Sequence, residues 1–311
     1  MVNESIMVSQ LATIIVIFYP EMKKLKCTID KVSMSSDVVI IFNNTHNETK
    51  DTALENELAK DLTSLLRQFK NTIVLDEGSN IGLSKAYNNA IKFVQQLGIS
   101  YYFILDQDSK IDAHLIPNLI KIQNYLENNY ELFLLGTLNK RPTISIIERI
   151  ENSISRKKSN YFIVNRNEMI LEKNIIINSG MFLTKNIFIL LGGFNENLFT
   201  DAIDLDFCYR AKRKGCKIFQ YSSLPIIQNE EDEYILRNIG INLRKTSVLR
   251  QKHIIYDSFL VVKEEFKYSK AVAIQLFISI FLQSIISAML LGNKRKRFVM
   301  LWQAFFSIFF S

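Results

Sequence analysis

The sequence contains few of the residues that mark disulfide-rich, metal-finger or low-complexity proteins. Its three cysteines (Cys27, Cys208 and Cys216) are odd in number and show no C-x-x-C spacing, which argues against a disulfide framework and a zinc site. Only four prolines and ten glycines occur among 311 residues, and 48% of all residues are hydrophobic. This composition excludes a disordered chain. We therefore expect a packed globular protein of a reducing cytoplasm, with one large catalytic unit and an extension.

Acidic residues are in the minority. The chain has 38 Lys and Arg residues against 31 Asp and Glu residues, which gives a net charge of +7. This sign favours an anionic partner, such as a nucleic acid, a phosphorylated ligand or an anionic membrane surface. The first apolar run, residues 11–18, has no positive segment before it and no small-x-small cleavage site after it. It is therefore expected to be a strand and not a signal peptide.

The common glycine-rich nucleotide motifs are missing as well. The loop at 77–82 (Glu-Gly-Ser-Asn-Ile-Gly) matches neither G-x-G-x-x-G nor G-x-x-x-x-G-K-[ST]. Its spacing therefore excludes a dinucleotide-binding loop and a P-loop. Taken alone, Asn80 in this loop is a turn residue or a helix cap.

Short β-branched runs alternate with helical periodicities along the first half of the chain. This alternation predicts βαβ units, in which parallel strands are joined by right-handed crossovers, and hence an α/β fold. Residues 139–177 show no clear pattern beyond two candidate strands. Before them we expect strands at 11–18, 37–42, 72–75, 101–105 and 131–138, and helices at 21–32, 54–69, 83–96 and 113–128.

Two carboxylates, Asp106 and Asp108, follow the fully apolar strand at 101–105. Ligands of open α/β sheets bind beyond the carboxyl ends of the strands. Carboxylates there can share a divalent cation, Mg²⁺ or Mn²⁺, whose remaining ligands come from substrate phosphates and water. The alternative is structural: Asp106 ends the strand, and Asp108-Ser109 or Asp112 caps the next helix.

A second acidic cluster, Asp201, Asp204 and Asp206, precedes a basic run at 210–217. One interpretation is a helix capping box with Asp201 at the N-cap. The other is a catalytic cluster beside an anionic substrate. The basic run fits that substrate, but it also fits a solvated helix face.

The C-terminal segment differs from the body. Residues 271–291 carry no charge and are long enough to span a bilayer. The basic run 294–297 follows, and the aromatic segment 298–310 after it is too short to span. We expect this region to lie in the membrane interface and to contact anionic lipid; a re-entrant hairpin and a helical dimer interface are the alternatives. The argument against spanning is a stripe of polar residues at a spacing of four: Gln275, Ser279, Gln283 and Ser287.

Taken together, the motifs resemble the family-2 glycosyltransferases of the GT-A fold, and most closely the bacterial rhamnosyltransferases that build surface polysaccharides. The form Asp-Gln-Asp-Ser favours rhamnosyl transfer. The motifs extend across residues 11–220 in a fixed order: Ile-Phe-Tyr-Pro at 17–20, Asn-Ile-Gly-Leu-Ser-Lys-Ala-Tyr-Asn at 80–88, Asp-Gln-Asp-Ser at 106–109, Asn-Ser-Gly at 178–180, Gly-Gly-Phe-Asn-Glu at 192–196, and the acidic cluster with Arg210.

The apolar and basic C-terminal segment predicts a helical, membrane-associated extension at 226–311, and the resemblance implies a mostly parallel, Rossmann-like GT-A catalytic domain at 1–225. It implies inverting transfer of a sugar, L-rhamnose from dTDP-L-rhamnose, to a lipid-diphosphate-linked saccharide at the cytoplasmic face of the cell membrane. Glucose, galactose or N-acetylhexosamine donors are the alternative. No nucleic-acid partner is implied, and the C-terminal helices are the expected place for contact between copies of the chain.

The resemblance also assigns roles to individual residues. Asp204 would act as the catalytic base, with Asp201 as the alternative base, and Asp108 with Asp106 would hold the divalent cation. Ser179, Gly180, Asp206 and Arg210 would lie on the acceptor side. The donor would be contacted by Tyr19, Asn43, Asn80, Gly82, Lys85, Asn88, Asp106 and Gln107.

Three positions depart from the family pattern. Asn43 stands where an Asp is usual, Gln228 where many relatives have His, and Tyr256-Asp257 where Arg-Asn is common. A non-catalytic partner subunit with the same fold is therefore one alternative. A phosphohydrolase of the haloacid-dehalogenase type is another, although that class carries its Asp-x-Asp motif on the first strand and not on the fourth.

Overall fold

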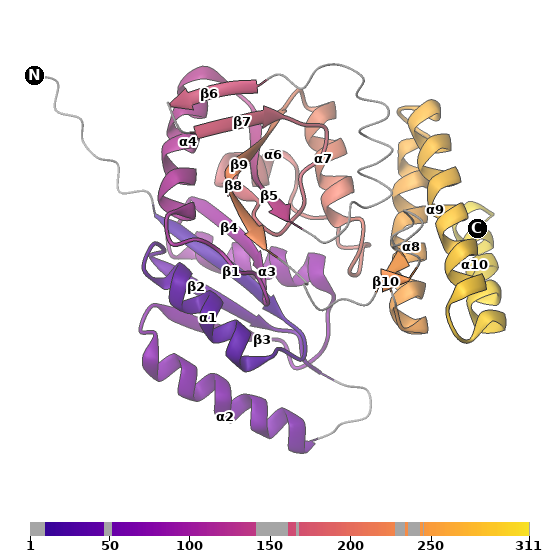
Figure 1. Cartoon of the computed structure of the whole chain (residues 1–311), viewed down its shortest axis with the longest axis horizontal. Coiled ribbons are helices and arrows are strands. Elements are labelled where there is room, and N and C mark those ends of the chain that lie inside the picture. Colours follow the sequence, from indigo (N-terminus) through magenta and orange to yellow (C-terminus); the bar gives the residue numbers. More distant parts are fainter. Residues whose placement is uncertain are drawn as a thin grey trace, which may run out of the picture.

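The structure, a computed structural model, describes residues 10–46, 52–140, 161–165, 168–227, 234–235, 243–244 and 246–310. Figure 1 shows a central sheet flanked by helices, with a layer of three C-terminal helices along one side. Within the described residues, nine strands form one mixed sheet in the order β3-β2-β1-β4-β8-β5-β9-β7-β6. The predicted α/β class is confirmed.

The first four strands of the sheet are parallel. Their β-branched residues suit a sheet buried on both faces, and every residue of β2 is buried. The elements lie within two or three residues of the predicted ranges. They are β1 (Leu11–Ile17), α1 (Met22–Ser33), β2 (Val38–Asn43), α2 (Thr52–Gln68), β3 (Thr72–Asp76), α3 (Leu83–Gln96) and β4 (Tyr101–Asp106).

The second half of the sheet is mixed. The short strand β8 pairs antiparallel with both β4 and β5, so it joins the parallel half to the rest. The two candidate strands of the unclear region are confirmed as the hairpin β6–β7. The elements are α4 (Leu115–Asn129), β5 (Phe133–Lys140), β6 (Tyr161–Asn165), β7 (Glu168–Glu172), β8 (Phe182–Thr184), α6 (Lys185–Leu190), α7 (Ile203–Arg213) and β9 (Lys217–Ile227).

Two hydrophobic clusters cover the two faces of the sheet. Ile14, Ile40 and Ile104 point to the face covered by α3 and α7. Their neighbours in sequence, Ile15 and Ile41, point to the face covered by α1 and α4. Successive strand residues alternate between faces, so purely apolar strands supply both clusters. The sheet is therefore a rigid base for the loops at its carboxyl edge.

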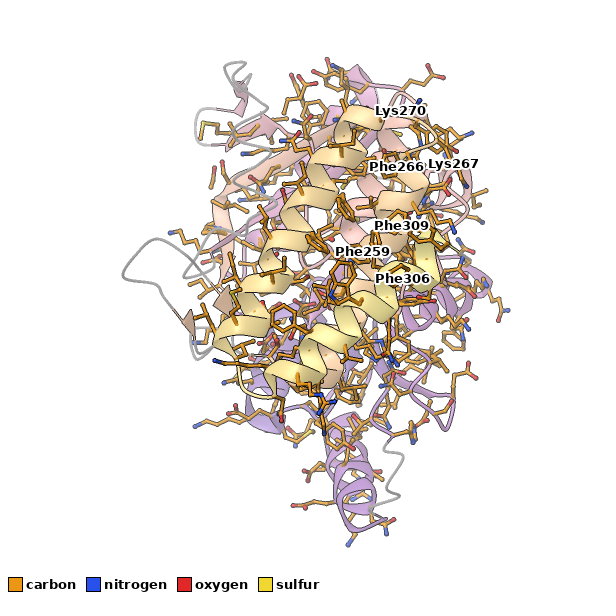
Figure 2. The ribbon with its side chains drawn as sticks, turned by 90° about the vertical axis from the view of Figure 1, so that its right-hand side faces the viewer. Phe259, Phe266, Lys267, Lys270, Phe306 and Phe309 are labelled. Atoms are coloured by element: carbon orange, nitrogen blue, oxygen red, sulfur yellow. The ribbon has the colours of Figure 1, made fainter. Side chains whose placement is uncertain are left out.

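Three helices follow a small β10 (Tyr234–Ile235) and β11 (Leu243–Arg244) ladder. They are α8 (Val248–Glu265), α9 (Lys270–Leu290) and α10 (Lys294–Phe309). The inner helix α8 packs against the body, and α9 and α10 lie outside it (Figures 1 and 2). Ile255, Phe259 and Val262 of α8 belong to the same buried cluster as the sheet. The helical extension is thus continuous with the body, and the boundary at 225 stays a prediction.

Candidate active site

The carboxylates Asp106 and Asp108 lie at the carboxyl end of β4, half-buried, as the sequence predicts. Buried hydroxyls fix the turn that carries them. The Ser179 Oγ accepts the backbone N–H of Asp106 at 3.1 Å and lies 3.0 Å from the Ser109 Oγ. The Thr28 hydroxyl donates to the Ser109 carbonyl at 2.9 Å. These bonds hold both carboxylates at the edge of the sheet.

The turn after β4 does not serve as a helix cap. Helix α4 begins at Leu115, with His114 at its N-cap and no side-chain capping bond. Asp112 accepts the backbone N–H of His114 at 2.8 Å in the preceding turn. Neither Asp108 nor Ser109 lies at the start of the helix, so the capping interpretation of these two residues is wrong.

The second acidic cluster is not a capping box either. Helix α7 begins at Ile203, and its N-cap is Ala202, which has no side-chain capping bond. Ala202 has a φ of 56°, in the left-handed region, which costs a residue with a Cβ on the order of 1 kcal/mol or more. Asp201 therefore lies one residue before the N-cap, and Asp204 lies in the first helical turn.

The buried phenol of Tyr87, on α3, brings the two acidic motifs together. Burial raises the pKa of Tyr87 well above its ordinary value, and the negative charges of Asp106 and Asp204 raise it further. Both carboxylates therefore act electrostatically on the same buried phenol. Tyr87 thus links Asp106, at the end of β4, to Asp204, in the first turn of α7, and its raised pKa keeps the phenol neutral.

A buried carboxylate from the C-terminal helices holds the loop beside this site. The Asp257 Oδ2, on α8, accepts the backbone N–H groups of Phe199 (3.1 Å), Thr200 (2.8 Å) and Asp201 (2.9 Å). Burial raises the pKa of Asp257, and the three N–H donors and His253 oppose that rise. No pattern in the sequence indicates this role, because Asp257 stands out there only as a departure from the family pattern.

Phe199 connects this loop to the loop before α3. Its carbonyl accepts the backbone N–H of Leu83 at 2.6 Å, and its ring stacks on His253 with centroids 4.5 Å apart. Gly82 has a φ of 83°, and a Cβ there would lie 2.8 Å from the Phe199 ring. Only glycine fits this contact. The predicted donor residue Gly82 is thus needed for the close approach of the two loops.

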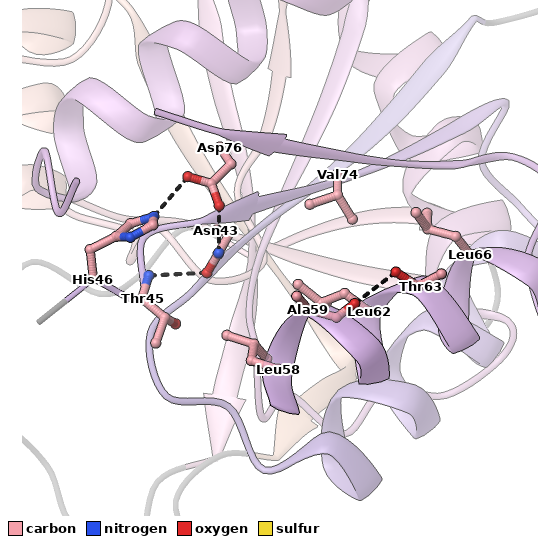
Figure 3. A pocket seen from close by; sticks show the side chains of 10 residues that line it. All are labelled: Asn43, Thr45, His46, Leu58, Ala59, Leu62, Thr63, Leu66, Val74 and Asp76. Carbon is pink, nitrogen blue, oxygen red and sulfur yellow. Dashed lines mark hydrogen bonds and ion pairs between the residues drawn. The ribbon is translucent and has the colours of Figure 1, made fainter. Parts of the chain in front are cut away.

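A hollow of about 240 Å³ lies at the ends of β2 and β3 (Figure 3). Asp76 is its polar centre: its carboxylate accepts the Asn43 amide at 2.7 Å and the Gly78 N–H at 2.7 Å, and it contacts the His46 Nε2 at 2.7 Å. Burial alone would raise the pKa of Asp76, but these hydrogen bonds and His46 outweigh it and lower the pKa. Apolar side chains of α2 and Val74 line the other wall.

The Asp76 carboxylate lies beside Asn43, the residue that stands where the resemblance leads us to expect an Asp. Asp76 lies directly after the expected strand at 72–75, just as Asp106 follows the strand at 101–105. Its position directly after a strand is the signal in the sequence that points to Asp76.

Known proteins share this arrangement of elements. A curated protein of Shigella flexneri, named dTDP-rhamnosyl transferase RfbF, is 23% identical over 260 residues, which cover 82% of this chain and 81% of that protein. The mannosyltransferase PcManGT of Pyrobaculum calidifontis, solved with GDP-Man and Mn²⁺, gives a TM-score of 0.53 at 10% identity and covers 96% of this chain and 81% of that one.

GalNAc-T7, solved with UDP, GalNAc and Mn²⁺, gives a TM-score of 0.52 at 12% identity over 82% of this chain; the chain spans about half, 47%, of that structure. No protein-family model matches the sequence. The chain has the GT-A glycosyltransferase fold. In an open α/β sheet of this kind, ligands bind at the carboxyl edge, so the predicted site residues are expected to meet there.

Two predicted donor residues of the GT-A sheet edge shape the first loop. The Gln107 amide accepts the Phe18 N–H at 2.7 Å and donates to the Phe18 carbonyl at 3.1 Å. Tyr19 has a φ of 45°, and its N–H donates to the Thr45 hydroxyl at 2.9 Å. The Tyr19 ring is 43% exposed, so it is open to a ligand.

The remaining donor residues differ in their exposure. The Asn80 Oδ1 accepts the Gly82 N–H at 3.1 Å, which makes Asn80 a turn residue, and Lys85 is exposed on the first turn of α3. Asn88 is buried. Its amide donates to the Phe194 carbonyl and to Glu196, and it accepts the Phe194 N–H, all at 2.9 Å. These bonds occupy both amide hydrogens, so Asn88 orients the turn at 192–196.

The predicted acceptor residues fall into two groups. Ser179 lies beside Asp106, and Gly180 lies where a Cβ would be 1.8 Å from the Thr137 Oγ1. Asp206 is buried and pairs with Arg210 at 2.7 Å. Asp206 and Arg210 line another hollow, of about 570 Å³, and neither Asp106 nor Asp204 belongs to its lining. Gln228 lies outside the described residues.

The carboxylates at the end of β4 fit a divalent cation that is only partly held by protein. In the part of the chain that the structure describes, no group of three or more His, Cys, Asp or Glu residues is arranged to hold a metal. Asp106 and Asp108 offer hard oxygen ligands at a half-buried edge. Such a pair matches Mg²⁺ or Mn²⁺, which take their other ligands from phosphates and water.

Proposed function

We propose that the protein transfers a sugar from a nucleotide-sugar to an acceptor hydroxyl with inversion at the anomeric carbon. The observation that carries this proposal is that Asp106, at the end of β4, and Asp204, at the start of α7, both act on the buried phenol of Tyr87. A donor diphosphate at Asp106 and Asp108 would place its sugar beside Asp204. One edge of the sheet would then hold the leaving group and the base on the two sides of the reacting carbon.

In this reaction the acceptor oxygen forms a bond to the anomeric carbon, and the bond from that carbon to the diphosphate oxygen breaks. The nucleoside diphosphate leaves with the bonding electrons, and the acceptor proton passes to the Asp204 carboxylate. A cation held by Asp106 and Asp108 would neutralise charge on the diphosphate. Tyr87, with its raised pKa, stays neutral and adds no negative charge to the site.

The donor base would occupy the hollow at the ends of β2 and β3. A pyrimidine has two apolar faces and a polar edge, which match the apolar wall of α2 and the group of Asn43, Asp76 and His46. The Asn43 Oδ1 accepts the Thr45 N–H at 3.0 Å, and the same oxygen keeps a second lone pair for a base N–H. This supports a place for Asn43 in donor binding despite the missing Asp.

We propose dTDP-L-rhamnose as the donor and a lipid-diphosphate-linked saccharide as the acceptor. The donor proposal rests on the Asp-Gln-Asp-Ser motif and on the name of the Shigella flexneri relative, which is 23% identical. The acceptor proposal rests on the apolar C-terminal helices, which pack on the same body as the active site.

Purified full-length protein tests these proposals when it is incubated with dTDP-L-rhamnose, UDP-glucose, UDP-galactose and UDP-N-acetylglucosamine in Mn²⁺. We expect the tightest calorimetric binding for dTDP-L-rhamnose, and release of the nucleoside diphosphate when acceptor is added. Tighter binding of another donor would replace rhamnose by that sugar. No binding of any donor would favour a non-catalytic partner subunit.

The cation has its own test in the variant Asp108→Ala. The variant should fold, because Asp108 lies beyond the strand and outside the core, and it should lose the part of donor binding that EDTA removes from the unchanged protein. Calorimetry with and without Mn²⁺ measures this loss without any turnover. Normal donor affinity in the variant, together with no effect of EDTA on either protein, would remove the cation from the proposal.

A further inference from the structure

The outer face of α9 and α10 exposes apolar side chains in rows. Ile274, Ile278 and Leu282 follow each other every four residues along α9 and are about half exposed, at 49%, 51% and 53%. Trp302 and Phe306 form the matching row on α10. Figure 2 shows the two helices side by side in front of α8. We call this surface, with Met289, Val299 and Phe310, the outer face.

The polar stripe of α9 does not interrupt the outer face. Ser287 is buried, and Gln275, Ser279 and Gln283 are partly buried. The Ser279 hydroxyl donates to the Gln275 carbonyl of its own helix at 2.8 Å. The stripe therefore runs along the flank of α9, and the side chains that point outward are apolar.

Charges lie at the two ends of the outer face and have one sign. Residues 266–311 contain no Asp or Glu. Lys267 and Lys270 lie at the α8–α9 turn, labelled in Figure 2, and Lys294, Arg295 and Lys296 are exposed at the start of α10. Lys267 pairs with Glu264 at 2.6 Å. The other four cations form no ion pair with another described residue.

Arg297 differs from the three basic residues before it. Its side chain is buried and donates to the Gly292 and Thr246 carbonyls at 2.7 Å each, and to Gln251 of α8. The expectation that the whole run 294–297 meets lipid is therefore wrong for Arg297, which ties α10 to α8. Three charges, those of Lys294, Arg295 and Lys296, are left to face lipid at the start of α10.

We propose that the outer face docks on an anionic lipid bilayer, with α9 and α10 lying in the plane of the interface. Apolar side chains would enter the boundary of the acyl chains, while the cations at both ends would meet anionic headgroups. This proposal gives the proposed transferase its location, the cytoplasmic face of the membrane. It rests on the exposed side chains, and not on the transfer reaction.

A second copy of the chain fits this surface less well. A two-fold contact presents the same patch from both partners. With no acid between residues 266 and 311, the cations of such a contact would have no acidic partner in the opposing patch. Anionic lipid supplies the missing negative charge.

A span through the bilayer also fits less well. Helix α9 is the one helix among the described residues that is long and apolar enough to cross a membrane. However, its inner side packs along α8: Phe277 stacks on Phe259 of α8 with ring centroids 5.8 Å apart. A crossing α9 would have to leave α8, or take that polar helix into lipid.

Flotation with vesicles of phosphatidylglycerol and phosphatidylcholine, compared with phosphatidylcholine alone, tests the proposal on the full chain. We expect binding to the anionic vesicles that high salt weakens only in part. The variant Lys294→Gln/Arg295→Gln/Lys296→Gln should bind on the order of a hundredfold more weakly, at about fivefold per charge. Its matched control is Lys23→Gln/Lys26→Gln/Lys31→Gln, which removes three exposed lysines from α1 and should bind as the unchanged protein does.

The apolar half of the face needs its own variant. Ile278→Gln/Leu282→Gln should weaken flotation at every salt concentration, whereas Met34→Gln/Leu249→Gln, which changes two exposed apolar residues outside the outer face, should not. Equal binding of the outer-face variants and their controls would overturn the proposal. The proposal would also be overturned if the outer-face changes affected self-association alone. Light scattering without vesicles measures self-association.

Labelling separates docking from crossing. In a Cys27→Ser background, which removes the exposed cysteine, Ala271→Cys and Gly292→Cys place one thiol at each end of α9. A membrane-impermeant maleimide added outside vesicles that already carry bound protein should react with both thiols. Protection of one end alone would show that α9 crosses the bilayer and would exclude the interfacial arrangement. Because no step measures sugar transfer, an inactive protein that docks leaves this proposal standing.

Discussion

Charged side chains are usually exposed and apolar side chains are usually buried. The carboxyl edge of the sheet departs from the first rule, and the outer face of α9 and α10 departs from the second. At the sheet edge, Asp106 and Asp204 are partly withdrawn from water beside a buried phenol. On the outer face, Leu282 and Phe306 are held in water. Each arrangement carries an energetic cost in the isolated protein. We propose that a ligand offsets this cost at the sheet edge and that a membrane offsets it on the outer face.

Helix α8 lies between these two regions and contacts both. Its Asp257 accepts three N–H groups of the loop at 199–201, and its Phe259 packs against Phe277, Phe305 and Phe309 of the outer helices. One rigid helix thus joins the acidic site to the surface that we propose for lipid. The comparison predicts that changes at the sheet edge alter turnover, whereas changes on the outer face alter location alone.

The largest expected effect is that of Asp204→Asn. An amide cannot take the acceptor proton, so turnover should fall by roughly 10²–10⁴-fold, while calorimetric donor affinity changes little. Asp201→Asn is the matched variant, since Asp201 lies in the loop directly before α7, and it should cost much less. The reverse ranking would make Asp201 the base. Flotation of both variants should equal that of the unchanged protein, because neither touches the outer face.

Much of the first half of the fold follows from the sequence because its strands are continuous apolar runs. The strands at 11–17 and 101–106 and the helix at 83–96 were predicted almost to the residue. The sheet order was not predicted, because β8 is only three residues long and lies between β4 and β5 through long-range pairing. Local pattern does not specify such a partner.

In the candidate site, too, some residues could be predicted from the sequence and others could not. Asp106 and Asp204 could be found from their positions at the end of a strand and at the start of a helix. Asp257 could not, because its role depends on α8 folding back onto the loop at 199–201, far away in the sequence. Asn88 was assigned to the donor on resemblance, and its position in the core could be seen only from its bonds to Phe194.

The next effect is that of Asp257→Ala, which tests the connection through α8. Three backbone N–H groups would lose their acceptor, so the free energy of unfolding should fall by about 2–4 kcal/mol. Asp257→Asn keeps an acceptor oxygen, and its loss of stability should be smaller. If Asp257 positions Asp201 and Asp204, kcat should fall in the Asn variant at temperatures where it is fully folded, with KM for the donor nearly unchanged.

The control for this positioning role is Asp37→Ala. Asp37 also accepts a backbone N–H, that of Leu11 at 2.7 Å, but it lies at the opposite end of β1 from the site. Its loss should lower stability and leave the kcat of the folded protein unchanged. Equal effects of Asp257→Asn and Asp37→Ala on kcat would reduce Asp257 to a structural residue.

The smallest effect is the pH dependence that Asp76 gives to the sheet edge. Hydrogen bonds from Gly78, Asn43 and His46 outweigh burial and lower the pKa of Asp76, so the folded protein favours the carboxylate. The resulting stabilisation is present above the unfolded pKa of 3.8 and disappears as the pH falls through the lower folded value. The carboxylate is 41% exposed, so water screens it, and we expect only about 0.5–1 kcal/mol.

Urea unfolding of Asp76→Asn checks this prediction. The variant should be less stable than the unchanged protein at pH 7, and the two should converge near the acidic end of the accessible range, where Asp76 is protonated in both states. Asp112→Asn, which removes a surface carboxylate with one backbone hydrogen bond, is the control at each pH. A stability difference for Asp76→Asn that stays constant down to acid pH would mean that its charge contributes nothing. In that case Asp76 would contribute only its shape and its hydrogen bonds to the hollow at the ends of β2 and β3. The effect of Asp76→Asn on donor affinity should then be equally independent of pH.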